Sequence, residues 1–240
     1  MKLNSNDIVL FSGDSITDGN RGHSMDCNHI MGHGYQFIIS SRLAFENSDT
    51  MPKFCNKGYS GAKMSDLLAK WQEDVLDINP TVISVLAGTN DANSGFYDNL
   101  SSEVAARNYK TNLTEALKIT CEYIPDIKIV VCQPFYFPIH DKSTGFDFVP
   151  HPYCEENHGR PDRNETEEAI DYRLKTMDLI YKYTEQVADE YADVYVPLYD
   201  RLSQEIAKSR TEYFMWDGTH PTVAGHEVIA REWLRATGKL

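Results

Sequence analysis

Residues 7–13 read DIVLFSG, a short, continuous apolar run that is closed by glycine. This pattern is typical of a strand that is buried on both faces of a parallel sheet. Similar runs, bounded by polar or turn residues, recur downstream at 81–88 (TVISVLAG), 127–133 (IKIVVCQ) and 193–198 (DVYVPL), and a weaker one lies at 52–58 (PKFCNKG). The sequence therefore predicts five strands.

Stretches with helical spacing alternate with these runs, at 35–45, 64–76, 103–121, 165–191 and 222–234. In the fourth stretch, a 3.6-residue period places six residues on one face: Ile170, Leu174, Met177, Tyr181, Thr184 and Val187. A helix that covers a sheet requires such a face. The alternation predicts an α/β fold, with a flavodoxin-like, five-stranded parallel sheet in a three-layer α/β/α arrangement and right-handed crossovers.

The length of 240 residues fits one α/β domain, so we expect residues 1–240 to fold as a single unit. Residues 138–164 break the alternation with four prolines, three histidines and no steady period. They predict a long loop insertion. Its role stays open between a lid, an oligomer contact and a plain solvated loop.

The charge of the chain narrows its partners. A formal net charge of −13 repels nucleic acid and anionic lipid, and no cluster of Lys or Arg offsets it. The apolar run at 8–11 is too short for a signal-peptide core or a membrane span. We therefore predict a cytoplasmic protein with neither a nucleic acid nor a membrane as partner.

The cysteines and the known cofactor motifs indicate whether the chain forms disulfides or binds a metal or a cofactor. The chain has an odd number of cysteines and no C-x-x-C pair, so we expect reduced, mostly buried thiols at Cys27, Cys55, Cys121, Cys132 and Cys154. The sequence contains no phosphate-binding or dinucleotide-binding glycine motif and no H-E-x-x-H. We predict no cofactor and no metal.

Ligands of open parallel sheets bind beyond the carboxyl ends of the strands, where loops converge. Three of the predicted strands are followed there by GDSITDG at 13–19, NKGYSG at 56–61 and GTND at 88–91. A fourth segment, WDGTHP at 216–221, precedes the last predicted helix. We expect these four segments to meet at one edge of the sheet.

In this order, the four segments resemble the motif blocks of the SGNH (GDSL) hydrolase family, and the resemblance covers nearly the whole chain. The fuller phrases NKGYSGAKMSDLLAKWQEDV, PTVISVLAGTND and WDGTHPTVAGH look most like the intracellular bacterial acetylxylan esterases. The resemblance implies the SGNH hydrolase fold and a serine esterase that deacetylates sugars. Tyr59 and the 138–164 segment depart from the pattern of those esterases and leave the substrate less secure than the mechanism.

The residue types in these segments suit nucleophilic catalysis. A serine hydroxyl needs a base within hydrogen-bond reach, and that base needs a third group to fix its tautomer. Ser15, His220 and Asp217 fill the roles of nucleophile, base and third group. Asp217 and His220 are three residues apart, so a tight turn can place the carboxylate beside the imidazole ring. Pro221 is expected at the first position of the last helix.

Developing negative charge on the ester oxygen needs preorganised donors. The resemblance assigns this role to the backbone N–H groups of Ser15 and Gly58 and to the side-chain amide of Asn90. Each residue also has a structural interpretation: Ser15 and Asp217 as helix caps, Gly58 as a turn glycine and Asn90 as an Asx-turn residue.

Further side chains near the segments receive weaker interpretations. We expect Asp14, Asp18 and Asp91 to hold loops by hydrogen bonds, and His226 to be a packing or surface residue. Three histidines lie where they can line the cleft without a catalytic role: His23, His29 and His33.

Aromatic faces suit the apolar faces of sugar rings. Seven aromatic residues lie in or beside the loops of the expected cleft: Phe96, Tyr97, Phe135, Tyr136, Phe137, Tyr153 and Trp216. Packing in the core or at a subunit contact is the competing interpretation for each of them. The aromatic residues and the resemblance together favour a homo-oligomer.

Three functions stay open at this point. The first is an esterase that removes acetyl groups from sugars such as xylo-oligosaccharides through an acyl-Ser15 intermediate. The second is an esterase, lysophospholipase or thioesterase for other acyl groups. The third is a flavodoxin-like module that binds a small ligand without chemistry.

Overall fold

The computed structural model describes residues 3–22, 28–139 and 166–238. The expected loop at 138–164 therefore lies almost entirely outside the described residues, and so do His23, Cys27, Tyr153 and Cys154.

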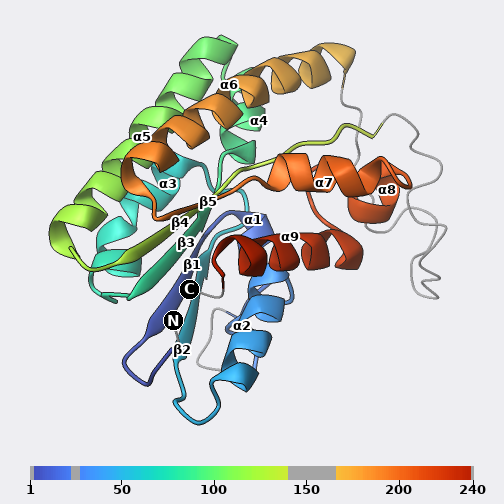
Figure 1. Ribbon diagram of the computed structural model, residues 1–240. Helices are drawn as coiled ribbons and strands as arrows, with labels where there is room; N and C mark the ends of the chain where they lie inside the picture. Colours follow the sequence, from blue (N-terminus) through green and yellow to red (C-terminus); the bar gives the residue numbers. More distant parts are fainter. Residues whose placement is uncertain (1–2, 23–27, 140–165, 239–240) are drawn as a thin grey trace.

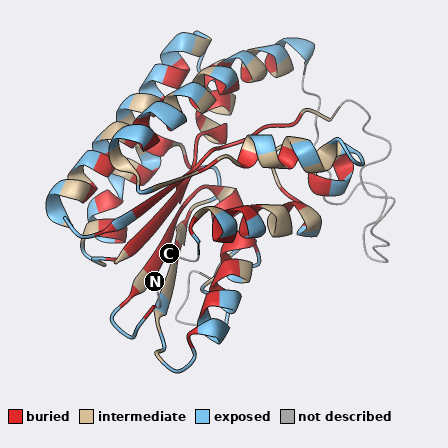
Figure 2. Cartoon of the chain, viewed as in Figure 1, coloured by how far each residue is buried: buried red, intermediate tan, exposed pale blue. Residues whose placement is uncertain are grey.

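The centre of the molecule is a parallel sheet of five strands in the order β2-β1-β3-β4-β5. The strands are β1 (Ile8–Gly13), β2 (Lys53–Gly58), β3 (Val82–Leu86), β4 (Lys128–Cys132) and β5 (Val194–Val196). Figure 2 shows the inner strands as the most continuously buried part of the chain, as their unbroken apolar runs require. The predicted five strands are confirmed, although β5 is shorter than expected.

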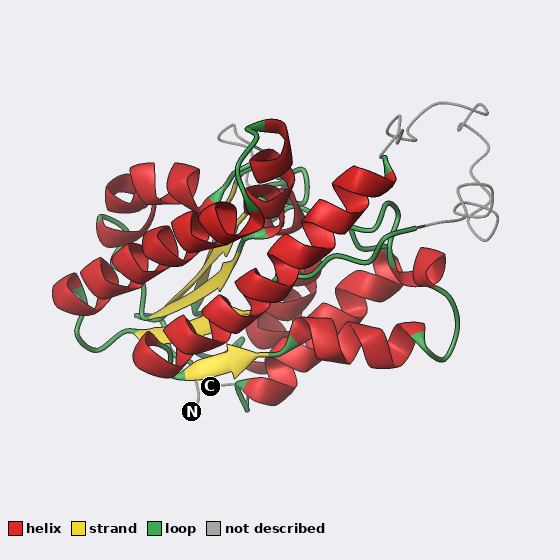
Figure 3. Ribbon diagram, turned by 90° about the horizontal axis from the view of Figure 1, so that it is seen from above, coloured by secondary structure: helices red, strands yellow, loops and turns green. Residues whose placement is uncertain are grey.

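Helices cover both faces of the sheet (Figures 1 and 3). One face is covered by α3 (Met64–Ala69), a π-helical turn (Gln72–Leu76), α5 (Ser102–Tyr123) and α6 (Glu167–Tyr191). The other face is covered by α2 (Tyr35–Glu46), α7 (Leu198–Ile206), α8 (Thr211–Phe214) and α9 (Val223–Ala236). The three-layer α/β prediction is confirmed. None of the described helices is both long enough and apolar enough to cross a membrane.

Successive side chains of each strand enter different cores, because a strand alternates its faces. In β3, Ile83 and Val85 pack with the α5 and α6 layer, whereas Val82 and Leu86 pack with the α2 and α9 layer. The buried hydroxyl of Ser84 accepts a hydrogen bond from the Trp233 indole at 3.0 Å. The two cores hold the sheet rigidly between the helical layers.

Several elements differ from the sequence-based expectation. The helix expected at 64–76 is divided, because α3 ends at Ala69 and a π-helical turn follows. The expectation omitted four short helices: α1 (Ser15–Asp18), α4 (Thr89–Tyr97), α7 and α8. The sequence of α4, TNDANSGFY, consists mostly of weak helix formers, so its helix depends on tertiary packing.

The last helix begins later than expected. Its N-cap is Thr222, whose hydroxyl accepts hydrogen bonds from the N–H groups of Ala224 and Gly225. Pro221 therefore precedes the cap instead of occupying the first helical position, and it pairs with Met215 in an isolated antiparallel bridge. This bridge closes the loop that carries residues 216–220.

The described cysteines are free thiols, but only Cys132 is fully buried. Burial raises the pKa of Cys132 to about 12, so this thiol stays protonated. Cys55 and Cys121 are partly exposed, which corrects the expectation for these two.

Candidate active site

The four segments meet at the carboxyl edge of the sheet. Gly13 and Gly58 are paired at the ends of β1 and β2, and the Tyr59 N–H donates to the carbonyl of Gly13 at 2.9 Å. Asp14 follows β1 as the N-cap of α1, so Ser15 is the first residue of that helix. The sheet thereby presents the serine at its edge.

Ser15, His220 and Asp217 form a continuous chain of hydrogen bonds. The distance between Ser15 Oγ and His220 Nε2 is 2.7 Å. On the far side of the ring, His220 Nδ1 lies 2.5 Å from Asp217 Oδ2. The carboxylate therefore holds the proton on Nδ1, which leaves Nε2 as the acceptor that faces the serine.

The turn that carries Asp217 is fixed by its own hydrogen bonds. Asp217 Oδ1 accepts from the N–H groups of Thr219 at 2.8 Å and His220 at 2.5 Å. The intervening Gly218 has a φ of +83°, and its carbonyl accepts a hydrogen bond from the Phe137 N–H at 2.8 Å. The carboxylate is 5% exposed, so this turn aligns a buried acid with a half-exposed histidine.

Helix α1 is capped by Asp14 rather than by Ser15. Asp14 Oδ1 accepts a hydrogen bond from the Ile16 N–H at 3.0 Å. Burial raises the pKa of Asp14 to about 6, against the opposing effect of this hydrogen bond and of nearby His220. The structural interpretation of Ser15 as a cap is therefore wrong, and its hydroxyl is available to His220.

Asn90 lies on the other side of the site, in the first turn of α4. Its side-chain amide donates one hydrogen bond to the carbonyl of Ala62 at 3.1 Å. An amide nitrogen carries two N–H groups, and the second has no acceptor among the described residues. This bond fixes the direction of the remaining donor.

Gly58 does not have the free N–H that its predicted role requires. The Gly58 N–H donates to Asn56 Oδ1 at 2.8 Å in a buried contact. A Cβ at this position would lie 2.2 Å from the backbone nitrogen of Asp18. Gly58 is thus needed for close packing against α1, and the structure does not support it as an oxyanion donor.

Gly61, at the end of the same NKGYSG segment, has the property that Gly58 lacks. Its N–H has no acceptor among the described residues, and its φ of +79° belongs to the left-handed region that favours glycine. The next residue, Ala62, is the one whose carbonyl receives the Asn90 amide. The sequence analysis named Gly58 rather than Gly61 as the donor, because two glycines in one segment cannot be distinguished without their hydrogen bonds.

The three aspartates hold loops, as expected. The Asp18 carboxylate accepts from the N–H groups of Arg21 at 3.1 Å and Ser60 at 3.0 Å. Asp91 accepts from the Met64 N–H, and burial raises its pKa to about 7. These contacts tie the serine loop and the glycine loop to their neighbours.

His226 is a packing residue, as one of its two interpretations held. Its Nδ1 accepts the Tyr35 N–H at 3.1 Å, and burial lowers its pKa to about 3, so the ring stays neutral. His33 is exposed. His29 is exposed, and its carbonyl accepts the Gly22 N–H.

The aromatic residues divide between their two interpretations, cleft lining and core packing. Phe135 and Tyr136 are 0% and 1% exposed, and Phe137 is 9% exposed. The chain after β4 stays between the layers, where the Thr89 hydroxyl donates to the Phe135 carbonyl. These three residues therefore belong to the cores, whereas Tyr97 is 66% exposed and Phe96 and Trp216 are half-buried.

Comparisons with known proteins agree on one family. The model of the GDSL-like lipase/acylhydrolase family matches residues 11–228. An acetylxylan esterase from Geobacillus stearothermophilus is 28% identical over 243 positions, which cover 99% of this chain and 97% of that protein.

Solved structures give the same result. A protein from Parabacteroides merdae, described as a GDSL-like lipase, matches with a TM-score of 0.79 at 26% identity, over 98% of this chain and 97% of its own. A catalytic mutant of Axe2, an acetylxylan esterase from Geobacillus stearothermophilus, matches with a TM-score of 0.77 at 26% identity, over 99% and 97%.

Proposed function

The chain belongs to the GDSL-like lipase/acylhydrolase family and is a carboxylic ester hydrolase, and from this premise we propose that it removes acetyl groups from carbohydrate esters. The observation that carries the esterase chemistry is the hydrogen-bonded chain from Ser15 through His220 to Asp217. The acetyl group and the sugar are supported by likeness to an acetylxylan esterase along almost the entire chain.

The proposed reaction begins with proton transfer from Ser15 Oγ to His220 Nε2, while the oxygen attacks the ester carbonyl carbon. The bond between this carbon and the sugar oxygen then breaks, and His220 returns the proton to the departing hydroxyl. Ser15 keeps the acetyl group. Water next gives a proton to His220 while its oxygen attacks the same carbon. The bond between this carbon and Ser15 Oγ then breaks, His220 returns the proton to Ser15 Oγ, and the product leaves as acetic acid, which ionises to acetate.

Charge on the carbonyl oxygen would be met by three donors. We assign this role to the N–H of Ser15, the N–H of Gly61 and the free amide hydrogen of Asn90. The first two N–H groups have no acceptor among the described residues. Gly61 replaces Gly58 in this set because the Gly58 N–H is donated to Asn56.

The acyl group is tested by the rates of hydrolysis for aryl esters of increasing chain length. The proposal expects a steep fall in kcat/KM beyond acetate or propionate, and acetate release from acetylated xylo-oligosaccharides. Equal or higher rates for octanoate would favour the alternative, an esterase, lysophospholipase or thioesterase for longer acyl groups.

The proposed setting is the cytoplasm, and the proposed assembly is a homo-oligomer of single-domain chains. Self-association is supported by exposed, large apolar side chains in and just after α2. Phe37, Phe45 and Met51 are 49%, 82% and 71% exposed. Light scattering of the purified protein measures its mass, and a monomer would contradict the proposed assembly.

A further inference from the structure

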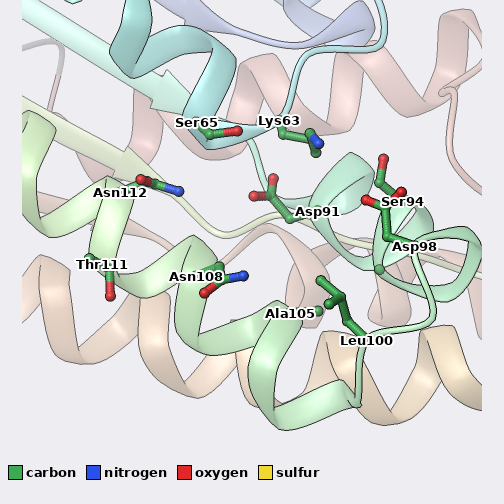
Figure 4. A pocket seen from close by; sticks show the side chains of 11 residues that line it. Lys63, Ser65, Asp91, Ser94, Asp98, Leu100, Ala105, Asn108, Thr111 and Asn112 are labelled. Carbon is green, nitrogen blue, oxygen red and sulfur yellow. The ribbon is translucent and has the colours of Figure 1, made fainter.

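A polar cleft of about 310 Å³ lies between α3, α4 and α5, beside but outside the candidate active site. Figure 4 shows its walls: Lys63 and Ser65 from the start of α3, Asp91 and Ser94 from α4, and the asparagines of α5. Neither Ser15 nor His220 lines it. Its volume is within the range of small-molecule sites, about 300 to 1,000 Å³.

Asp91 supplies a buried carboxyl group in the wall of this cleft. The residue is 7% exposed, and its carboxylate lies between α3 and α5 in Figure 4. Both of its oxygens share one donor, the Met64 N–H, at 3.1 and 3.3 Å. A carboxylate offers about four acceptor sites, so most of the capacity of Asp91 is left for a molecule in the cleft.

Donors face this acceptor from the other walls. Asn108 and Asn112 are four residues apart on α5, so both lie on the side of that helix that borders the cleft. The side chains of Asn108, Asn112 and Ser65 have no hydrogen-bond partner among the described residues. Asn108 is exposed, and Asn112 and Ser65 are half-buried, so their hydrogen-bonding groups are open to a molecule in the cleft.

The mixture of groups identifies the class of ligand. Lys63 is the one cation of the lining and is offset by the carboxylate of Asp98, so the lining has no net positive charge to attract phosphate or other anions. Leu100 and Ala105 are the large and small aliphatic residues of the lining, and its other side chains are polar. Paired donors and acceptors without net positive charge suit a neutral molecule rich in hydroxyl groups.

We propose that this cleft is a second binding site, separate from Ser15, for a neutral sugar unit. Asp91 accepts hydroxyl hydrogen bonds in this site, and Asn108 and Asn112 bind further hydroxyl groups with their amides. The inference goes beyond the proposed function, because ester hydrolysis at Ser15 does not require it.

The first test is a titration of the Ser15→Ala variant with xylose. The side-chain amide resonances in ¹H–¹⁵N NMR spectra monitor binding. The proposal expects saturable shifts of the Asn108 and Asn112 amides with xylose, and none with inorganic phosphate or hexanoate. No saturable shift of these amides, or shifts with phosphate or hexanoate instead, would overturn the proposal.

The second test is the Asn112→Leu variant, which removes an amide and fills part of the cleft, with Thr114→Leu on the same helix as its matched control. Xylose should bind Asn112→Leu at least about tenfold more weakly and Thr114→Leu unchanged. Xylose affinity equal to that of the unmodified protein in Asn112→Leu would place the sugar elsewhere.

Hydrolysis of an aryl acetate separates the two proposals. The Asn112→Leu variant should keep the rate of the unmodified protein, because Asn112 does not contact the reacting groups. A chain that binds xylose in the cleft but fails to release acetate from sugars would contradict the proposed substrate and leave the second site standing.

Discussion

The candidate site has two halves, which we call the base half and the oxyanion half, and they use different chemical groups. The base half consists of side chains, since Ser15, His220 and Asp217 bond to one another at 2.7 and 2.5 Å. The oxyanion half consists of main-chain N–H groups and the one amide of Asn90. Side chains keep their chemistry wherever they lie, but an N–H group is useful only if no other acceptor occupies it.

This difference is seen within a single segment. In NKGYSG, the N–H of Gly58 is donated to Asn56, whereas that of Gly61 stays open beside the carbonyl that holds Asn90. The base half can thus be identified from residue types, and the oxyanion half only from a hydrogen-bond inventory. Variants in each half test this contrast.

The base half should depend strongly on its acid. Asp217→Asn keeps the shape of the side chain but removes the charge that holds the proton on His220 Nδ1. We expect kcat for an aryl acetate to fall by about 10⁴-fold, as in triads of this geometry. A fall of less than about tenfold would show that His220 does not depend on this carboxylate.

The oxyanion half should respond more weakly to the loss of one donor. Asn90→Ala should lower kcat by about 100- to 1,000-fold and leave the urea midpoint close to that of the unmodified protein. Asn90→Asp, which substitutes a negative charge, should be at least as impaired. An active Asn90→Ala enzyme would remove Asn90 from the oxyanion half.

Substitution of Gly58 should affect folding stability, whereas substitution of Gly61 should affect activity. In Gly58→Ala the new Cβ meets the Asp18 nitrogen at 2.2 Å, so we expect loss of folding stability. In Gly61→Ala no atom lies within 4 Å, and the cost is the positive φ alone, about 1 to 2 kcal/mol. Kinetics and urea unfolding of both variants measure this contrast.

The expected pattern for the pair is specific. Gly61→Ala should fold and show a lowered kcat, because the strained turn displaces its N–H. A stable Gly58→Ala variant with strongly reduced kcat, beside a fully active Gly61→Ala, would return the donor role to Gly58.

A buried carboxyl beneath the base half should appear in the pH dependence of stability. The pKa of Asp14 is raised from 3.8 to about 6, so between these values the folded state holds a proton that the unfolded chain releases. The free energy of unfolding therefore falls as pH rises through this window, by up to about 3 kcal/mol.

Asp14→Asn keeps the oxygen that caps Ile16 but carries no charge. Its gain in unfolding free energy over the unmodified protein should be largest above pH 6 and vanish near pH 4. Urea unfolding at several pH values measures it. A gain that does not change with pH would mean that Asp14 is not the group that titrates.

The fold was predictable from sequence to the level of its layers. Unbroken apolar runs identified the strands, because a strand with helices on both faces has no exposed side. The α4 helix was not predictable, since its sequence has weak helix formers and it is held by packing. The start of α9 was misplaced because Pro221 was expected at the first helical position, whereas Thr222 caps the helix and Val223 begins it.

The part of the candidate site that consists of catalytic side chains was predictable from sequence, and the part that consists of main-chain donors was not. Ser15, His220 and Asp217 were chosen by residue type and spacing, and the structure brings them together. The choice between Gly58 and Gly61 needed coordinates. For Phe135 to Phe137 the sequence left cleft lining and core packing both open, and their burial between the layers decides for core packing.

The most direct test of the account is labelling by a fluorophosphonate, which reacts with an activated serine, followed by intact mass and peptide mapping. The account predicts one adduct per chain on Ser15, none on Ser15→Ala, and much slower labelling of His220→Ala. An unlabelled unmodified protein, or equal labelling of Ser15→Ala, would contradict it.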